Sequence, residues 1–150
     1  MKFSAAVLAI VAATGVSAAP AAGDSVSMMA ATPQWTIRDA KRYCRADDSI
    51  CNWKFGIDTG NGQVVECRHN VNGPKASQKA QAGPSTCGDF TVTSGWSGQF
   101  GPGNGFTTLS VVSKSKHQII WPAYTDKQLA GAQIVKPDQS YAPATIPIPK

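Results

Sequence analysis

The chain has 150 residues, a formal net charge of +5 and a mean hydropathy of −0.17; 42% of its residues are hydrophobic and only 15% are charged. This balance is typical of a chain that buries a core and disfavours intrinsic disorder. The length fits one domain. The positive charge is too mild for a dedicated nucleic-acid binder, so we expect no specific nucleic-acid partner.

Residues 1–18 have the features of a secretory signal peptide. Lys2 supplies a positive charge, residues 5–13 form an apolar stretch, and Val16-Ser17-Ala18 is typical of a signal peptidase site. Pro20 favours cleavage directly after Ala18. No later apolar run approaches the ~18 residues that a membrane span requires. We therefore expect a secreted, extracellular protein without a membrane span.

Four cysteines, Cys44, Cys51, Cys67 and Cys87, are expected to form two disulfides, because their number is even and the secretory route is oxidising. None belongs to a Cys-x-x-Cys motif, the pattern that would suggest zinc or redox chemistry, so we expect no metal site. Three pairings are possible. We favour Cys44–Cys51 and Cys67–Cys87, whose short loops would contribute about 2.5 and 3 kcal/mol in the chain-entropy treatment.

The remaining sequence predicts an all-β fold. Residues 19–33 are Ala-rich and are expected to form a flexible leader, whereas residues 34–136 alternate short runs of aromatic and β-branched residues with Gly, Asn, Pro and Ser. We predict a single antiparallel β-barrel or sandwich. The expected strands are 34–40, 52–58, 63–68, 90–96, 106–113, 117–121 and 133–136.

Local patterns predict how some of these strands are connected. Trp53, Phe55 and Ile57 alternate with polar or small residues and should share one buried face. Residues 59–62, which contain Asn-Gly, predict a tight hairpin turn. Residues 70–85 are polar and predict a long loop between two cysteines.

The C-terminal third predicts a short helix and an extended end. Residues 125–131 begin with a capping threonine and end with glycine, which suits about one helical turn. Residues 137–150 contain four prolines and should run extended over the surface as a strap or tail.

Four basic residues, Arg38, Lys41, Arg42 and Arg45, follow the i, i+3, i+4, i+7 spacing of one helical face. A strand over the same residues would scatter them over two faces, and the sequence leaves both structures open. The run predicts either a solvated face or a binding site for phosphate, sulfate or pectin-like polyanions.

Few residues suggest catalysis. Glu66, Arg68 and a histidine, either His69 or His117, are the residue types that a small secreted ribonuclease would need. Alternation along a strand would, however, point His69 away from Glu66 and Arg68. The adjacent Asp47 and Asp48 are expected in a solvated turn, since the further oxygen ligands of a calcium loop are missing. We therefore expect no enzyme and keep the ribonuclease-like hydrolase as the alternative.

The first resemblance rests on four stretches, residues 35–37, 52–57, 60–67 and 85–92. These stretches are similar to the fungus-specific β-barrel family of the Alternaria major allergen. Three further stretches resemble the small secreted elicitors that provoke a hypersensitive response in plants, including one from the rice-blast fungus: residues 94–100, 121–126 and 137–141. The resemblance covers residues 35–146.

This resemblance implies an antiparallel β-barrel, no cofactor, secretion into the plant apoplast and recognition by the plant immune system. It implies the Cys67–Cys87 disulfide, whereas Cys44 and Cys51 replace a cysteine pair that the allergen has near its C-terminus. No spare cysteine is present for the allergen's covalent dimer, so we expect a monomer. The expected partners are an apoplastic or cell-surface plant protein and polyanionic wall material. The function implied is that of a non-enzymatic effector or elicitor.

Overall fold

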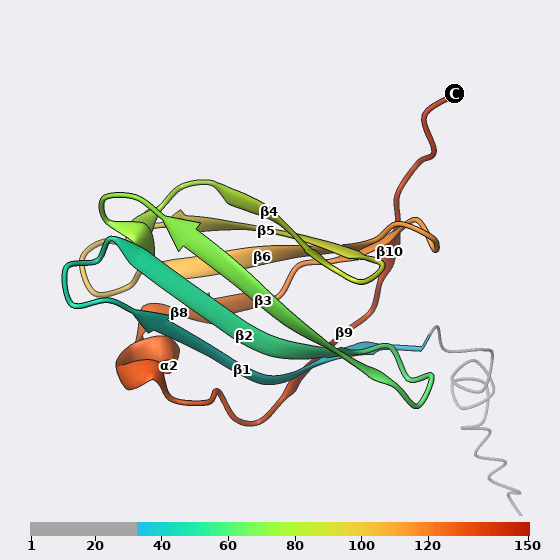
Figure 1. Cartoon of the computed structure of the whole chain (residues 1–150), viewed down its shortest axis with the longest axis horizontal. Helices are drawn as coiled ribbons and strands as arrows, with labels where there is room; N and C mark the ends of the chain where they lie inside the picture. Colours follow the sequence, from blue (N-terminus) through green and yellow to red (C-terminus); the bar gives the residue numbers. More distant parts are fainter. Residues whose placement is uncertain (1–32) are drawn as a thin grey trace, which may run out of the picture. The chain divides into compact units, whose positions relative to one another are not determined.

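The computed structural model describes residues 33–150, which form two antiparallel β-sheets (Figure 1). The predicted signal peptide and residues 19–32 of the predicted leader lie outside the described residues. The predicted all-β class is confirmed, and its strands form two open sheets.

The four-stranded sheet, here called sheet A, has the order β3-β2-β1-β9. Its strands are β1 (Trp35–Cys44), β2 (Ile50–Asp58), β3 (Val64–Asn72) and β9 (Gln139–Tyr141). The six-stranded sheet, sheet B, has the order β10-β7-β6-β5-β4, and β8 also pairs with β6. Its strands are β4 (Ala82–Cys87), β5 (Phe90–Ser97), β6 (Phe106–Ser113), β7 (Gln118–Ile120), β8 (Ala123–Thr125) and β10 (Ala144–Thr145).

The hydrophobic core lies between the two sheets. Trp53, Phe55 and Ile57 are buried on one face of β2, as their alternation predicts. Trp35 of sheet A meets Phe90 of sheet B edge to face, with ring centroids 5.6 Å apart. Such aromatic contacts contribute to stability beyond the area they bury.

Each side of this two-layer arrangement is closed by a different covalent connection. The Cys67–Cys87 disulfide joins β3 to β4, which are edge strands of sheets A and B. On the other side, the chain passes from β9 in sheet A to β10 in sheet B through Ala142 and Pro143. The Cys44–Cys51 disulfide closes the β1–β2 hairpin. Both predicted pairings are therefore confirmed.

Two predicted local structures are wrong. Residues 133–136 form no strand; the neighbouring pairing with β1 is made by β9 instead. Residues 70–85 are not a continuous loop, because β3 extends to Asn72, a short 3-10 helix η1 (Ala76–Gln78) follows, and β4 begins at Ala82. The sequence does not predict β4 because this strand contains Gly83 and Pro84, and both residue types are rare in strands.

The predicted helical turn is present as α2 (Asp126–Leu129), which continues into the 3-10 helix η2 (Ala130–Ala132). Thr125 forms a capping box with Gln128, and this satisfies two backbone N–H groups at the helix start. Over residues 33–150, no helix has the length and apolar character needed to cross a membrane.

Candidate functional site

The geometry of the candidate site begins with a β-bulge in β1. Arg38 pairs with Gly56 and Lys41 with Lys54, so β1 holds one more residue than β2 between these pairs. Asp39 takes up the extra length with a φ of 48°. A bulge shifts the alternation of a strand, and this one turns Arg42 to the inside and Lys41 to the outside.

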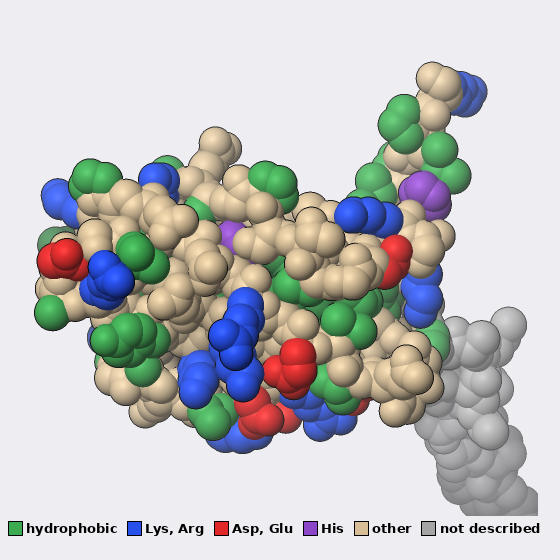
Figure 2. All heavy atoms as spheres, viewed as in Figure 1, with side chains coloured by type: hydrophobic (Ala, Val, Ile, Leu, Met, Phe, Trp, Pro, Cys, Tyr) green, Lys and Arg blue, Asp and Glu red, His purple; other side chains and the backbone are tan. Residues whose placement is uncertain are grey.

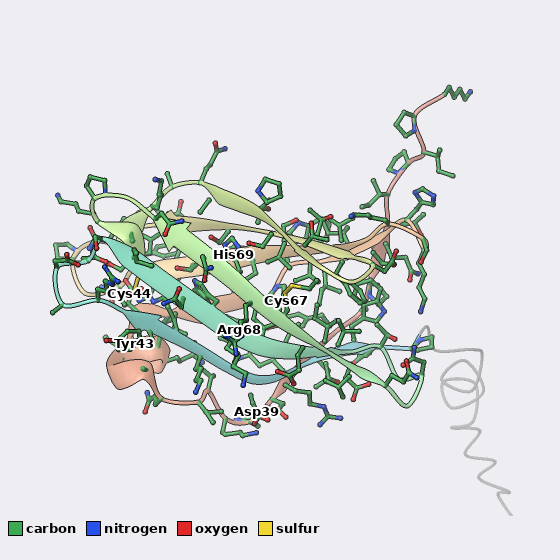
Figure 3. The ribbon with its side chains drawn as sticks, in the orientation of Figure 1. Asp39, Tyr43, Cys44, Cys67, Arg68 and His69 are labelled. Carbon is green, nitrogen blue, oxygen red and sulfur yellow. A yellow bond between two sulfur atoms is a disulfide. The ribbon has the colours of Figure 1, made fainter. Side chains whose placement is uncertain are left out.

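The outward residues of β1, β2 and β3 form rows across sheet A. One row consists of Lys41, Lys54 and Arg68, since Lys41 pairs with Lys54 and Lys54 with Arg68. We call these three residues the cationic row. Figure 2 shows Lys and Arg side chains gathered over this face, and Figure 3 shows Arg68 pointing outward from β3.

The next row on the same face is polar and aromatic. Tyr43 pairs with Asn52, and Asn52 with Asn70. Tyr43 is 57% exposed. Together with the cationic row, these residues line a shallow groove of about 510 Å³.

The cationic row has no acidic partner within the part of the chain that the structure describes. Every ion pair there involves Arg38, Arg42 or Lys136. Two acidic residues lie on the same outer face. Glu66 is one row along, opposite Gly56, and Asp58 is paired with Arg38. Like charges directly opposite each other destabilise a sheet, so the row does not serve the fold.

The four basic residues singled out in the sequence do not form one surface. Arg38 is exposed and forms ion pairs with Asp58 and Asp138, at 2.7 and 3.6 Å. Hydrogen bonds from Arg38 and from the amide of Gly60 lower the pKa of Asp58. Lys41 belongs to the cationic row, and Arg45 is exposed beyond the end of β1. The sequence left open whether residues 38–45 form a helix or a strand; residues 38–44 belong to the strand β1.

Arg42, the fourth of these residues, is only 9% exposed. Its guanidinium donates to Asp126 Oδ1 at 3.2 Å and to the carbonyl of Ser77 at 3.2 Å. It also lies over the ring of Trp53, 5.6 Å from the centroid. Arg42 therefore packs between β1, η1 and α2, and its guanidinium is held by these contacts.

The residues of the ribonuclease-like alternative are not brought together. Glu66 and Arg68 are exposed on the outer face of β3, whereas His69 is 0% exposed on the inner face. The two ring nitrogens of His69 each lie 2.8 Å from a serine hydroxyl, of Ser85 and Ser94. Burial lowers the pKa of His69 and so favours the neutral ring.

His117, the other imidazole, is exposed in the turn between β6 and β7 of sheet B. No position on sheet A therefore offers Glu66, Arg68 and either histidine to one substrate among the described residues.

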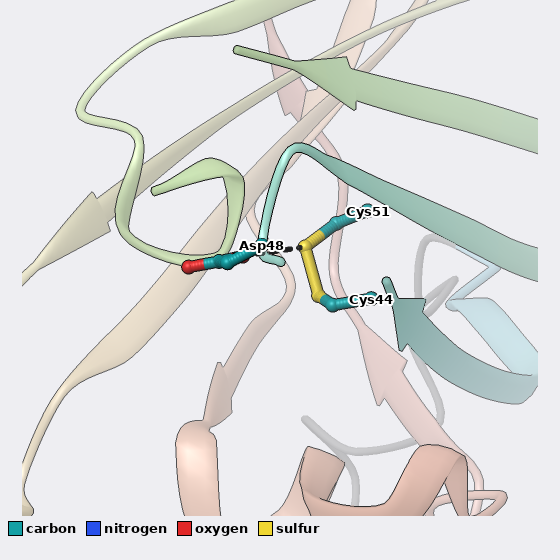
Figure 4. Close-up of side chains that lie close together, drawn as sticks. All are labelled: Cys44, Asp48 and Cys51. Carbon is teal, nitrogen blue, oxygen red and sulfur yellow. Dashed lines mark hydrogen bonds between the residues drawn. A yellow bond between two sulfur atoms is a disulfide. The ribbon is translucent and has the colours of Figure 1, made fainter. Parts of the chain in front are cut away.

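Cys44, Cys51 and Asp48 lie close together, but the arrangement does not suit a metal ion (Figure 4). Both sulfur atoms belong to one disulfide, so neither is a thiolate. The Asp48 carboxylate accepts hydrogen bonds from the backbone N–H and the hydroxyl of Ser77, at 2.8 and 2.7 Å. Asp48 therefore anchors η1 to the β1–β2 turn, a role that the sequence pattern does not reveal.

Comparisons with known proteins identify relatives of this chain. A family model described as "Effector TSP1" matches residues 36–146. A curated protein named Effector TSP1, from Hypocrea virens (strain Gv29-8 / FGSC 10586), is 49% identical over 141 residues. That match covers 94% of this chain and 95% of the relative.

Proposed function

The chain belongs to the Effector TSP1 family, and we propose that it is a secreted fungal effector that elicits plant defence responses from the apoplast through its folded surface, without catalysis. The family match over residues 36–146 carries the proposal, because it spans both sheets. The name of the relative describes an effector, and a plant host is our inference from the resemblance to plant elicitors.

Two disulfides support the extracellular part of the proposal. Cys44–Cys51 and Cys67–Cys87 use every cysteine in the described residues. Such bonds persist in oxidising compartments and are rare in the cytosol. The signal peptide predicted for residues 1–18 would deliver the chain to such a compartment.

The placement of polar side chains supports action without catalysis. General acid–base chemistry needs groups that reach one substrate within hydrogen-bond distance. Here Glu66 and Arg68 lie on the outer face of β3, whereas His69 lies on its inner face. His69 is held between two serine hydroxyls inside the molecule. The feature that a host protein would recognise is the folded surface, which the two disulfides stabilise.

The test is infiltration of the protein, purified from the medium of a secreting host, into plant leaves. We expect an oxidative burst or local necrosis. The variants Glu66→Gln and His117→Gln should retain the full response, because both side chains are exposed and hold no structural contact that the proposal needs.

A variant that replaces both Cys67 and Cys87 with serine should weaken the response. It removes a crosslink with a sequence separation of 20, which is worth about 3 kcal/mol, and so loosens the junction of the two sheets. Circular dichroism and urea unfolding would accompany each assay. Absence of a response to the folded protein would overturn the proposal, and loss of response in a folded Glu66→Gln variant would favour the hydrolase.

A further inference from the structure

We propose that the outer face of sheet A binds a linear acidic polysaccharide, of the uronic-acid class, through Lys41, Lys54 and Arg68, with Tyr43 as a stacking platform. The chemical class of the ligand follows from the groove itself, and its source in the plant wall rests on the proposed function. The binding surface differs from the basic run in the sequence, with which it shares only Lys41.

The spacing of the charges favours a linear ligand. Lys41, Lys54 and Arg68 occupy directly paired positions on three adjacent strands. Neighbouring strands lie about 4.8 Å apart, so the row presents a ladder of positive charges perpendicular to the strands. A uronic-acid chain carries one carboxylate on each sugar, and a charge ladder of this kind can meet successive carboxylates.

The types of side chain favour carboxylates and sugar hydroxyls. An arginine can bind a carboxylate with two parallel hydrogen bonds, and lysines add point charges. Asn52 and Asn70 in the adjacent row offer amide donors and acceptors for hydroxyl groups. The ring of Tyr43, which is 57% exposed, provides an apolar face for the C–H face of a pyranose.

The absence of acidic partners makes the row available to a ligand. Among residues 33–150, none of the three cations forms an ion pair, although Arg38 on the same face pairs with Asp58 at 2.7 Å. The row therefore keeps three like charges side by side, and an anionic ligand would relieve their repulsion.

Other anionic partners fit this surface less well. A single-stranded nucleic acid would use several stacking rings along a longer basic groove, and this groove has one exposed ring. A lipid surface would require several apolar side chains that enter the bilayer interface, whereas Tyr43 is the one exposed aromatic side chain that lines this groove.

The test is calorimetric titration of the full secreted protein with oligogalacturonate and with the same oligomer fully methyl-esterified. We expect binding to the acid form, none to the ester, and weaker binding as salt rises. Lys54→Gln should weaken binding about tenfold, the loss expected for one charge-assisted contact.

Two triple variants that lose the same charge distinguish the effect of the cationic row on binding from the effect of net charge. Lys41→Gln/Lys54→Gln/Arg68→Gln should lose binding. Lys75→Gln/Lys116→Gln/Lys127→Gln removes the same charge from exposed positions outside the groove and should retain binding. Equal losses in the two variants would overturn the proposal, as would equal affinity for acid and ester.

Tyr43→Ala distinguishes a sugar from a simple polyanion. It should weaken oligogalacturonate binding about tenfold and leave the binding of inorganic polyphosphate unchanged, because only the sugar has a face to stack. Tighter binding of single-stranded DNA or of anionic vesicles than of oligogalacturonate would overturn the proposal.

The leaf assay keeps this inference separate from the proposed function. A row variant that no longer binds the oligomer but still elicits a response would leave both proposals standing as independent properties. A wild-type protein that binds the oligomer without eliciting a response would overturn the proposed function alone.

Discussion

The inner and outer cations of β1 differ in what they contact. Arg42 lies on the inner side, with Asp126, the Ser77 carbonyl and the Trp53 ring as partners. Lys41, its neighbour in sequence, lies on the outer side beside Lys54 and pairs with no acid in the described part of the chain. A single bulge at Asp39 separates the two environments. Adjacent basic residues can therefore serve the fold and a ligand surface respectively.

The largest expected effect comes from removing the inner cation. Arg42→Ala should lower the free energy of unfolding by about 3 kcal/mol, the lower end of the range for a broken buried pair, because Asp126 retains some access to solvent. Arg42→Lys should rescue only part of this loss, since lysine lacks the planar fork. Urea unfolding measures both changes.

Arg45→Ala is the control for that experiment. Arg45 is exposed directly after β1, so its removal should change stability by less than about 0.5 kcal/mol. An Arg42→Ala variant as stable as the Arg45→Ala variant would show that the inner cation is not structural and would remove the contrast between the two environments.

The strands and disulfides were largely predictable because their signals are local. The alternation of Trp53, Phe55 and Ile57 predicts a half-buried strand, and a capping Thr125 followed by Gly131 predicts a short helix. The bulge was not predictable, because an aspartate within a strand pattern is only a weak signal for the φ of 48° that Asp39 adopts. Unless the position of the bulge is known, the basic residues of β1 cannot be assigned to the inner or the outer face of sheet A.

The cationic row depends on the pairing register of β2 and β3, and the turn predicted from the sequence gives a register that is wrong by one residue. A four-residue turn over residues 59–62 would place Asp58 opposite Gln63 and Lys54 opposite Cys67. The loop instead includes Gln63, so Asp58 pairs with Val64 and Lys54 with Arg68. A slip of one residue exchanges the two faces of a strand, and this is why the row could not be found from the pattern alone.

His69 extends the comparison to a group that becomes a cation only in acid. Burial lowers its pKa below the ordinary value of 6.5, so the unfolded chain binds a proton at a higher pH than the folded chain. The contribution of His69 to the free energy of unfolding should be constant above about pH 7 and should fall as the pH decreases from about 6.5 toward the lowered pKa.

Urea unfolding at pH 7.5 and pH 5 tests this expectation, above the range where aspartates with lowered pKa values, such as Asp58, begin to titrate. His69→Gln should cost about 1–3 kcal/mol at pH 7.5, since it disturbs two buried hydrogen bonds, and should flatten the pH dependence. A slope that persists in His69→Gln would assign it to another group.

The smallest expected effect concerns the middle of the cationic row. Lys54 lies between Lys41 and Arg68, so Lys54→Gln removes both cross-strand repulsions while keeping most of the side-chain stem. The variant should be more stable than the wild type by about 0.2–1 kcal/mol at low salt. At about 1 M salt, where the Debye length is near 3 Å, the gain should vanish.

Lys116→Gln in the β6–β7 turn provides the control and should show no gain at either salt concentration. A gain that survives high salt would reflect packing rather than charge, and the contrast between inner and outer cations would then lose its electrostatic basis. A gain confined to low salt, together with weaker oligogalacturonate binding, would mean that the wild-type sequence retains a destabilising charge at the position where the proposed ligand needs it.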